Sequence, residues 1–161
     1  APDLVIRVRY PIQWDIRRID SSTAIQQFIE NTQSPLDTRC LVIAQADHDA
    51  PADERKQAEF AWTISPETQV PLGAKLLEKK KVMLDGRYGW KLSYETYRPT
   101  PSVDALLRSV VYLTYARGYS VVFMCTCAGR MEDARLGAIE HDKRLPLFDM
   151  MATSLVIGRE P

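Results

Sequence analysis

Alternating apolar and polar residues predict a strand at the start of the chain. Every second residue between positions 4 and 10 is apolar, and Arg7 and Arg9 occupy positions between them. This period of two is typical of a strand with one buried face. Pro11 ends the predicted strand because proline has no N–H to donate to a ladder. We expect the indole of Trp14, which follows closely, to cover the end of the sheet.

The pattern continues with two strands and a helix. Residues 26–30 and 38–46 are segments of strand length, and residues 31–35 between them are typical of a turn. Residues 52–62 contain good helix formers with charges on one side. The first half of the chain is therefore predicted to be a strand meander followed by a helix.

Two β-hairpins are predicted in the second half of the chain. Residues 75–84 and 90–97 flank Asp85-Gly86-Arg87, and an Asp-Gly pair between alternating segments is a strong hairpin signal. Residues 106–115 and 119–127 flank Ala116-Arg117-Gly118 in the same way. The strands of each hairpin are expected to share apolar faces: Val82 and Leu84 with Trp90, Leu92 and Tyr94, and Val111, Leu113 and Tyr115 with Val121, Phe123 and Cys125.

The C-terminal region predicts two helices and a closing strand. Residues 130–139 have helical composition, and the apolar residues within 147–155 recur at the spacing of one helical face. Val156 and Ile157 end the pattern as a short strand. Hairpins interleaved with helices predict an α+β fold, a mainly antiparallel sheet with helices packed on it. Residues 1–161 are expected to form a single domain.

Composition and charge exclude several classes of function. The 161 residues include 21 lysines and arginines and 21 aspartates and glutamates, so the chain lacks the positive excess that nucleic-acid backbones attract. No apolar run approaches the roughly 20 residues that a membrane-spanning helix needs. The chain begins with Ala1-Pro2, as expected of a chain trimmed of a targeting peptide. We therefore expect no nucleic-acid partner, no transmembrane segment and, at most, peripheral membrane association through a complex.

The three cysteines are expected to be free thiols. Cys125 and Cys127 lie two apart in a predicted strand, so their side chains share a face, and three cysteines cannot all pair. A Cys-x-Cys without further cysteines or neighbouring histidines is a weak zinc signal, because zinc usually takes four ligands. Packing in the core is the favoured interpretation, and metal binding is the alternative.

The sequence carries no catalytic or cofactor-binding motif. It has no Gly-x-Ser-x-Gly elbow, no Gly-x-Gly-x-x-Gly fingerprint and no Gly-x-x-x-x-Gly-Lys loop. His48 lies between two aspartates, a pattern that could coordinate a metal but is more often a solvated loop. His141 is expected at the end of a helix, where a partly charged ring is favourable. We therefore predict no enzyme activity, no cofactor and no metal.

Two surface segments are candidates for contact with a partner. Four arginines near the N-terminus form a predicted basic patch, and arginine is common in interfaces because its planar fork pairs with carboxylates. A stiff, exposed loop between the two hairpins carries a tyrosine and an arginine, although a simple connector is the alternative. The candidate contact residues are Arg7, Arg9, Arg17, Arg18, Tyr97 and Arg98.

The run Glu78-Lys79-Lys80-Lys81 is the most conspicuous group of like charges. On a strand, Lys79 and Lys81 point outward, opposite Val82. They could contact anionic lipid or an acidic partner, but lysines on an edge strand also prevent unwanted sheet pairing. The edge-blocking interpretation is favoured.

The order of the elements and three short motifs resemble the PsbP-like superfamily. The motifs are Tyr10-Pro11-x-x-Trp14, Asp85-Gly86 followed by Trp90-Lys-Leu-Ser-Tyr94, and residues 146–157, and the resemblance covers residues 4–157. It implies an α/β/α sandwich around an antiparallel sheet and carries over no functional residue. It also implies roles that share binding and lack chemistry: extrinsic photosystem subunits in the thylakoid lumen, a Ran-binding nuclear import factor, and DcrB-type proteins that include secretion chaperones.

The resemblance and the lack of catalytic motifs predict a binding protein. The first hypothesis is a non-catalytic accessory or assembly subunit of a larger, membrane-associated protein complex. The alternative is a soluble chaperone or carrier that holds a protein partner transiently. A small enzyme is a third reading, and it would require a deep pocket with convergent polar groups. The expected trimming of the N-terminus and the resemblance together suggest an organelle, the thylakoid lumen or the mitochondrion.

Overall fold

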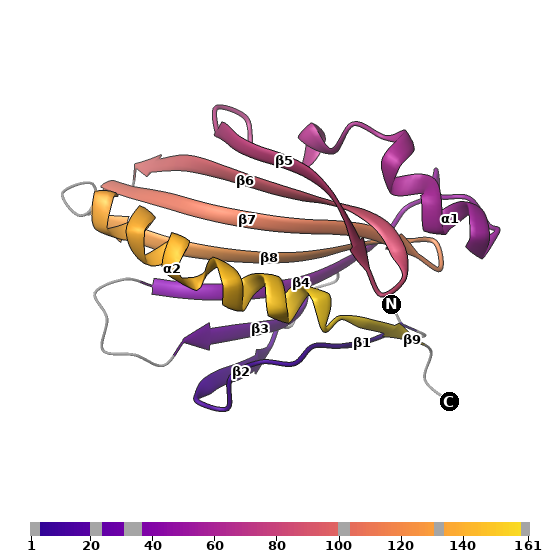
Figure 1. Ribbon diagram of the computed structural model, residues 1–161, viewed down its shortest axis with the longest axis horizontal. Coiled ribbons are helices and arrows are strands. Elements are labelled where there is room, and N and C mark those ends of the chain that lie inside the picture. Colours follow the sequence, from indigo (N-terminus) through magenta and orange to yellow (C-terminus); the bar gives the residue numbers. More distant parts are fainter. Residues whose placement is uncertain (1–3, 20–23, 31–36, 100–103, 131–133, 159–161) are drawn as a thin grey trace.

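A seven-stranded antiparallel sheet forms the centre of the molecule (Figure 1). The computed structural model describes residues 4–19, 24–30, 37–99, 104–130 and 134–158. In these ranges the strands of the main sheet follow the order β2-β3-β4-β8-β7-β6-β5, and β1 pairs with β9 in a small second sheet. The strands are β1 (Val5–Arg7), β2 (Trp14–Arg18), β3 (Ala24–Glu30), β4 (Asp37–Ala46), β5 (Lys75–Leu84), β6 (Arg87–Pro99), β7 (Asp104–Ala116), β8 (Tyr119–Arg130) and β9 (Val156–Gly158). The helices are α1 (Glu54–Phe60), η1 (Ala61–Thr63), η2 (Pro66–Gln69) and α2 (Ala134–Thr153).

Helices pack on both faces of the main sheet. α2 lies along one face, across β8 and β7, while α1 and η1 cover one end of the other face, over β6 and β7 (Figure 1). Phe123 and Phe148 belong to the core under α2, and Trp90 and Leu113 belong to the core under η1. The predicted α+β class, an antiparallel sheet with helices packed on it, is confirmed. We refer below to the α2 face and the α1 face of the sheet.

The predicted registers of the two hairpins are wrong by one residue. Lys81 pairs with Trp90 in the first hairpin, and Tyr112 pairs with Phe123 in the second. Leu84 therefore lies on the α2 face while Trp90 lies on the α1 face. These strands carry apolar residues on both sides, so alternation could not fix the register, and a shift of one residue moves every side chain to the other face.

α2 is one helix where the sequence predicted two. Pro146 lies inside it and is exposed, so the carbonyl that loses its N–H donor can be satisfied by water. His141, Phe148 and Met151 lie on the buried side and pack toward the sheet, which holds both halves of the helix in line. The prediction that His141 ends a helix is therefore wrong, because the buried face of α2 extends back to this residue.

The N-terminal segment forms two strands rather than one. β1 is short and pairs with β9, outside the main sheet. β2, which the sequence pattern did not indicate, pairs with β3 and forms an edge of the main sheet. Trp14 begins β2 and is buried in the core under α2.

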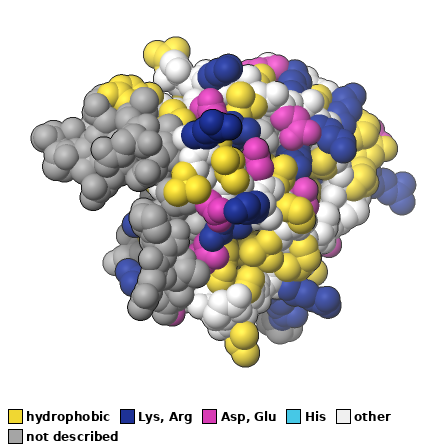
Figure 2. All heavy atoms as spheres, turned by 60° about the vertical axis from the view of Figure 1, so that its left-hand side comes forward, with side chains coloured by type: hydrophobic (Ala, Val, Ile, Leu, Met, Phe, Trp, Pro, Cys, Tyr) yellow, Lys and Arg dark blue, Asp and Glu magenta, His cyan; other side chains and the backbone are white. Residues whose placement is uncertain are grey.

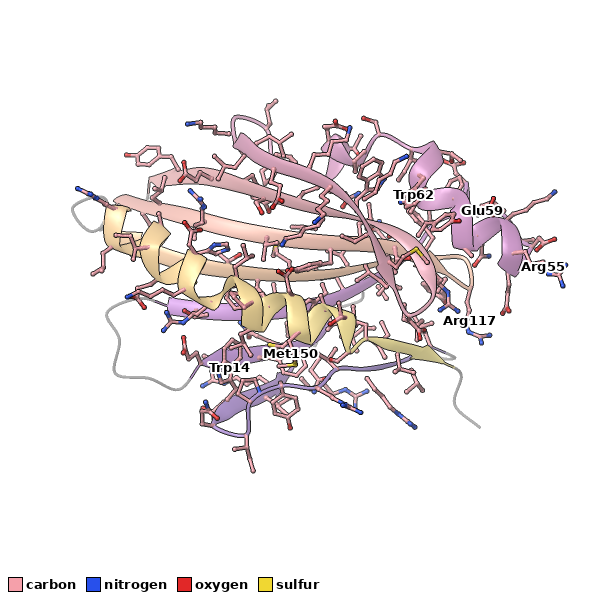
Figure 3. The ribbon with its side chains drawn as sticks, viewed as in Figure 1. Trp14, Arg55, Glu59, Trp62, Arg117 and Met150 are labelled. Carbon is pink, nitrogen blue, oxygen red and sulfur yellow. A yellow bond between two sulfur atoms is a disulfide. The ribbon has the colours of Figure 1, made fainter. Side chains whose placement is uncertain are left out.

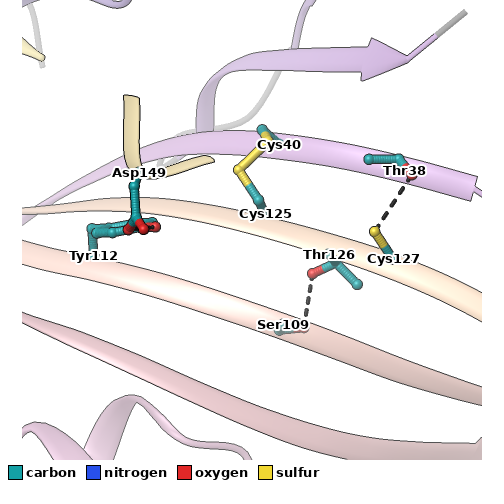
Figure 4. The surroundings of a disulfide bond; sticks show 8 residues. All are labelled: Thr38, Cys40, Ser109, Tyr112, Cys125, Thr126, Cys127 and Asp149. Atoms are coloured by element: carbon teal, nitrogen blue, oxygen red, sulfur yellow. Dashed lines mark hydrogen bonds between the residues drawn. A yellow bond between two sulfur atoms is a disulfide. The ribbon is translucent and has the colours of Figure 1, made fainter. Parts of the chain in front are cut away.

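A disulfide joins β4 and β8 near the middle of the sheet. Cys40 and Cys125 are direct cross-strand partners with Cα atoms 4.0 Å apart, and both are fully buried (Figure 4). The prediction of three free thiols is therefore wrong, because it compared cysteines within one strand and lacked the pairing of β4 with β8. Cys127 is a free, buried thiol whose Sγ lies 3.5 Å from the hydroxyl of Thr38, and burial raises its pKa.

Candidate protein-binding surface

An open hollow of about 650 Å³ lies where four segments meet at the C-terminal end of α2. Its walls come from the tip of the β5–β6 hairpin, the last turn of α2, the start of β9 and Arg9 in the segment after β1. Its lining consists of Arg9, Met83, Asp85, Gly86, Met150, Thr153, Ser154, Leu155 and Val156. We call this site the methionine hollow.

Hydrogen bonds hold the walls of the methionine hollow together. Asp85, with φ of 49°, and the glycine after it form the tight hairpin turn that their sequence favours. The Asp85 carboxylate accepts the backbone N–H of Ile157 at 2.9 Å and the guanidinium of Arg87 at 2.7 Å. The backbone N–H of Arg9 donates to the hydroxyl of Ser154 at 2.8 Å. The hairpin tip, β9, α2 and the segment after β1 are thus fixed to one another.

Three exposed apolar side chains line this hollow. Met83 from β5, Met150 from α2 and Val156 from β9 are 49%, 44% and 51% exposed. Met150 lies on the side of α2 that faces the segment containing β1 (Figure 3). Methionine is flexible and polarizable, so it adapts to the shape of a bound partner. Apolar side chains gathered in this way are typical of an interaction surface.

Arg9 adds a positive charge to the wall of the hollow. Among the described residues, no ion pair involves Arg7, Arg9, Arg17 or Arg18. Four arginines elsewhere in the described ranges each pair with a carboxylate: Arg87, Arg108, Arg117 and Arg144. On the face shown in Figure 2, acidic and basic side chains are interspersed. Within the described ranges, Arg9 therefore presents an unpaired guanidinium at the wall of the hollow.

The four N-terminal arginines do not form one patch. Arg7 lies on β1, and Arg9 follows it and lines the methionine hollow. Arg17 and Arg18 are neighbours on β2, so their side chains leave on opposite faces of the sheet. The structure thus brings Arg9, of these four, to the candidate site.

The second predicted contact segment lies far from the first. The loop predicted for residues 97–101 is wrong for residues 97–99, which end β6, where Tyr97 pairs with Leu106; residues 100 and 101 lie outside the described ranges. Four strands separate β6 from β2 in the main sheet. Tyr97 is 49% exposed, and the side chain of Arg98 lies outside the described part. These two residues do not join the methionine hollow.

The methionines of the hollow were missed by sequence reasoning. Met83 lies between Val82 and Leu84, and Met150 precedes Met151, so both read as members of apolar runs. A signal was present for Met150, which falls outside the helical face predicted for residues 147–155. An apolar residue at a polar position of the period marks an exposed side chain, but the sequence could not show that such residues converge.

Lys79 and Lys81 of the lysine run contact other groups of the chain. Lys79 and Lys81 lie on the α1 face of β5, an edge strand of the described sheet, opposite Val82 as predicted. Lys79 pairs with Glu67, and its hydrogen bond lowers the pKa of that carboxyl to about 2. The ammonium of Lys81 lies 4.5 Å from the ring centre of Trp62. The edge position of β5 is the one that the edge-blocking interpretation requires.

The two histidines lie in different surroundings and belong to no metal-binding cluster in the described part of the chain. There, no three His, Cys, Asp or Glu side chains converge in a way that could hold a metal ion. His48 is exposed in a turn where the N–H of Asp49 donates to the Asp47 carboxylate at 2.9 Å. His141 is 1% exposed, neither ring nitrogen has a hydrogen-bond partner, and burial lowers its pKa.

No helix within the described ranges has the length and apolar composition to cross a membrane.

Comparison with solved structures gives relatives in fold. No known family model matches the chain, and no curated protein matches its sequence. The chain is similar to the crystal structure of LpqN, involved in cell envelope biogenesis of Mycobacterium tuberculosis, with TM-score 0.58, 11% identity and coverage of 96% of this chain and 84% of that chain. It is also similar to PA94 of Pseudomonas aeruginosa, a putative regulator of unknown function, with TM-score 0.50, 17% identity and coverage of 89% and 96%. At these identities the similarity shows the α+β fold alone.

Proposed function

We propose that the protein is a non-catalytic accessory or assembly subunit that binds a protein partner in the methionine hollow. The observation that carries the proposal is the convergence of Met83, Met150 and Val156, each about half exposed, from three separate elements. A single exposed apolar side chain is ordinary, but three around one hollow are typical of a surface that another protein covers.

Charge indicates that the partner segment is acidic as well as apolar. Arg9 lines the hollow, Arg7 lies two residues before it, and neither has an ion pair among the described residues. A carboxylate of the partner would form a charge-assisted hydrogen bond with Arg9 while a neighbouring apolar side chain packs on Met150. Such a contact is weakened by salt, because exposed charges are screened.

A transient chaperone or carrier for proteins is the second candidate. Met83 and Met150 favour it, because flexible methionine side chains repack around different ligands. A subunit stays with its assembly, whereas a chaperone leaves its client, so persistence of the complex separates the two functions.

We further infer a PsbP-like relationship and an oxidising compartment. The antiparallel sheet with α2 on one face and α1 on the other supports the relationship, since the sequence motifs imply this layering. The Cys40–Cys125 disulfide supports the compartment, because cytosolic thiols are usually kept reduced. An organelle lumen meets this condition.

The test is sedimentation of the native protein from a gentle extract of its source, with and without a high-salt wash. We expect the wild type to travel with a large assembly and salt to release it. Met83→Asp/Met150→Asp should remain at the mass of the free chain, because each aspartate places a charge against the apolar partner. Leu136→Asp is the matched control, since Leu136 is 43% exposed on the same helix and does not line the hollow.

Thermal melting of both variants shows whether each is folded. A folded Met83→Asp/Met150→Asp protein that still sediments with the assembly contradicts the proposal. Wild-type protein that sediments as a free chain contradicts the subunit role. In that case, recovery of a client after rapid chemical crosslinking supports the transient carrier.

A further inference from the structure

The α1 face of the sheet carries a second hollow, independent of the proposed function. α1 covers only one end of this face, so the strands stay open toward the other end (Figure 1). The hollow has a volume of about 230 Å³ and lies over β4, β8, β7 and β6, with Pro71 from the loop before β5 in its wall. It shares no residue with the methionine hollow.

The strand register aligns polar side chains in a row across the floor of this hollow. Arg39 pairs with Thr126, Thr126 with Ser109, and Ser109 with Tyr94. The hydroxyl oxygens of Ser109 and Thr126 lie 2.8 Å apart (Figure 4). Arg39 is exposed and Ser109 is buried, so the row leads from a guanidinium at the surface to hydroxyls in the floor.

Apolar side chains flank the polar row. Leu41 and Met124 are cross-strand partners on one side of it, and Leu107 lies on the other. A guanidinium fork pairs with a carboxylate, and hydroxyl groups can donate to the carboxylate oxygens. A short aliphatic chain attached to that carboxylate would pack on Leu41 and Met124. The lining therefore matches a ligand with an anionic head and an apolar tail.

We propose that this hollow, named here the hydroxyl hollow, binds a small aliphatic carboxylate. Water occupies about 30 Å³ per molecule in the liquid, so 230 Å³ corresponds to a ligand of about eight non-hydrogen atoms. Hexanoate has this size. Its carboxylate lies against Arg39 and the Ser109–Thr126 pair, and its chain lies on Met124.

The experiment is a titration of the ¹⁵N-labelled protein with sodium hexanoate, followed by backbone amide shifts. We expect saturable shifts at Ser109, Met124 and Thr126 and no shifts at Met83 or Met150. Hexan-1-ol, which lacks the charge, is expected to bind at least about tenfold more weakly, because the charge-assisted hydrogen bond is lost.

Two arginine variants make the test specific. Arg39→Gln is expected to weaken hexanoate binding about tenfold by removing the charged fork. Arg55→Gln should bind as the wild type does, since Arg55 is exposed on α1 and points away from the sheet (Figure 3). The amide spectrum of each variant reports that it is folded. Shifts that do not saturate, or an Arg39→Gln protein with wild-type affinity for hexanoate, would overturn the proposal.

Discussion

Three polar side chains, Lys91, Tyr112 and His141, are buried between α2 and the sheet. The Asp149 carboxylate accepts hydrogen bonds from Lys91 at 2.8 Å and from Tyr112 at 2.6 Å. Burial, together with this carboxylate, raises the pKa of Tyr112, so the phenol remains a hydrogen-bond donor. Neither ring nitrogen of His141 has a hydrogen bond of normal geometry, Nδ1 lies 3.5 Å from Asp142 Oδ1, and burial lowers the pKa of the ring. The polar groups of this contact therefore differ in how well each is satisfied.

Acidification should destabilise the protein through His141. Its pKa in the folded state lies below the ordinary value of about 6.5, so the unfolded chain takes up the proton first as the pH falls. The neutral His141 ring therefore costs the free energy of unfolding nothing above about pH 6.5. Below that pH, the free energy of unfolding falls by at most about 1.4 kcal/mol per pH unit, until the folded-state pKa of His141 is reached. Arg108 and Lys91 face the ring and oppose its charging, while Asp142 favours it. Urea unfolding between about pH 7.5 and 5 measures the effect.

His141→Leu isolates this contribution. Leucine is close to histidine in size and packs beside Phe148, but it does not titrate. We expect the unfolding free energy of the variant to depend less on pH below about 6.5. Equal pH dependence in the variant and the wild type would assign the acid sensitivity to carboxylates and contradict the prediction.

At the scale of elements, hairpin turns and the start of α1 were predictable, whereas register was not. The Asp85-Gly86 turn located the first hairpin, and β5 has the bounds that the sequence predicted. The Asp53 side chain caps α1, whose N-terminus the composition of residues 52–62 indicated to within two residues. Register failed because β6, β7 and β8 carry apolar residues on both faces, and β7 is covered by α2 on one face and by α1 and η1 on the other.

The residues of the methionine hollow were also hard to predict, because they meet through contacts between segments far apart in the sequence. Arg9 was proposed as a contact residue because arginine is common in interfaces, and this depends on residue type alone. Met83 and Met150 come from different elements. Their approach depends on the hydrogen bond from the backbone N–H of Ile157 in β9 to the Asp85 carboxylate. The Cys40–Cys125 bond likewise depends on the pairing of β4 with β8, which no local pattern contains.

The contact between α2 and the sheet should depend strongly on Asp149. Asp149→Ala leaves Lys91 and Tyr112 without their acceptor, and we expect a loss of about 2 kcal/mol in unfolding free energy. The loss is smaller than for a fully buried pair because the Asp149 side chain is 45% exposed. Lys143→Ala is the control, since its pair with Glu140 is exposed and should contribute less than about 0.5 kcal/mol. Urea titration of both variants measures the difference.

A second variant tests whether the loss in Asp149→Ala comes from the unpaired charge of Lys91. Lys91→Met in the Asp149→Ala background removes the buried charge and should recover part of the lost stability. If the double variant is no more stable than Asp149→Ala, the loss arises from packing or from Tyr112 rather than from an uncompensated lysine.

At the scale of the whole molecule, one covalent bond ties distant parts of the chain together. Cys40 and Cys125 are 85 residues apart in sequence and join the N-terminal meander to the C-terminal hairpins. The pairing of β1 with β9 brings segments near the two ends of the chain together as well. The two hollows share no lining residue, so the two proposed ligands would occupy different parts of this frame.

Reduction of the disulfide should lower the stability of the whole sheet. For a closed loop of 85 residues, loop-closure entropy gives a contribution of about 4 to 5 kcal/mol. Urea unfolding with and without a phosphine reductant measures it, and Cys127→Ser should show the same difference. We also expect maleimide to label one thiol in the denatured, unreduced chain and three after reduction. Three labelled thiols without reduction would contradict the disulfide.

The pairing of β4 with β8 also sets an order of events during synthesis. β5, β6, β7 and β8 are joined by consecutive pairings and can form from local contacts, which favours rapid folding. β4 emerges from the ribosome earlier but has to wait for β8, whose cysteine lies 85 residues after its own. Until then the backbone N–H and C=O groups at Leu41, Val42 and Ile43 lack their β8 partners and can pair with a strand of another chain. The nascent chain is therefore most vulnerable to aggregation before β8 has been made, and a factor that shields β4 in this interval would raise the yield of native protein.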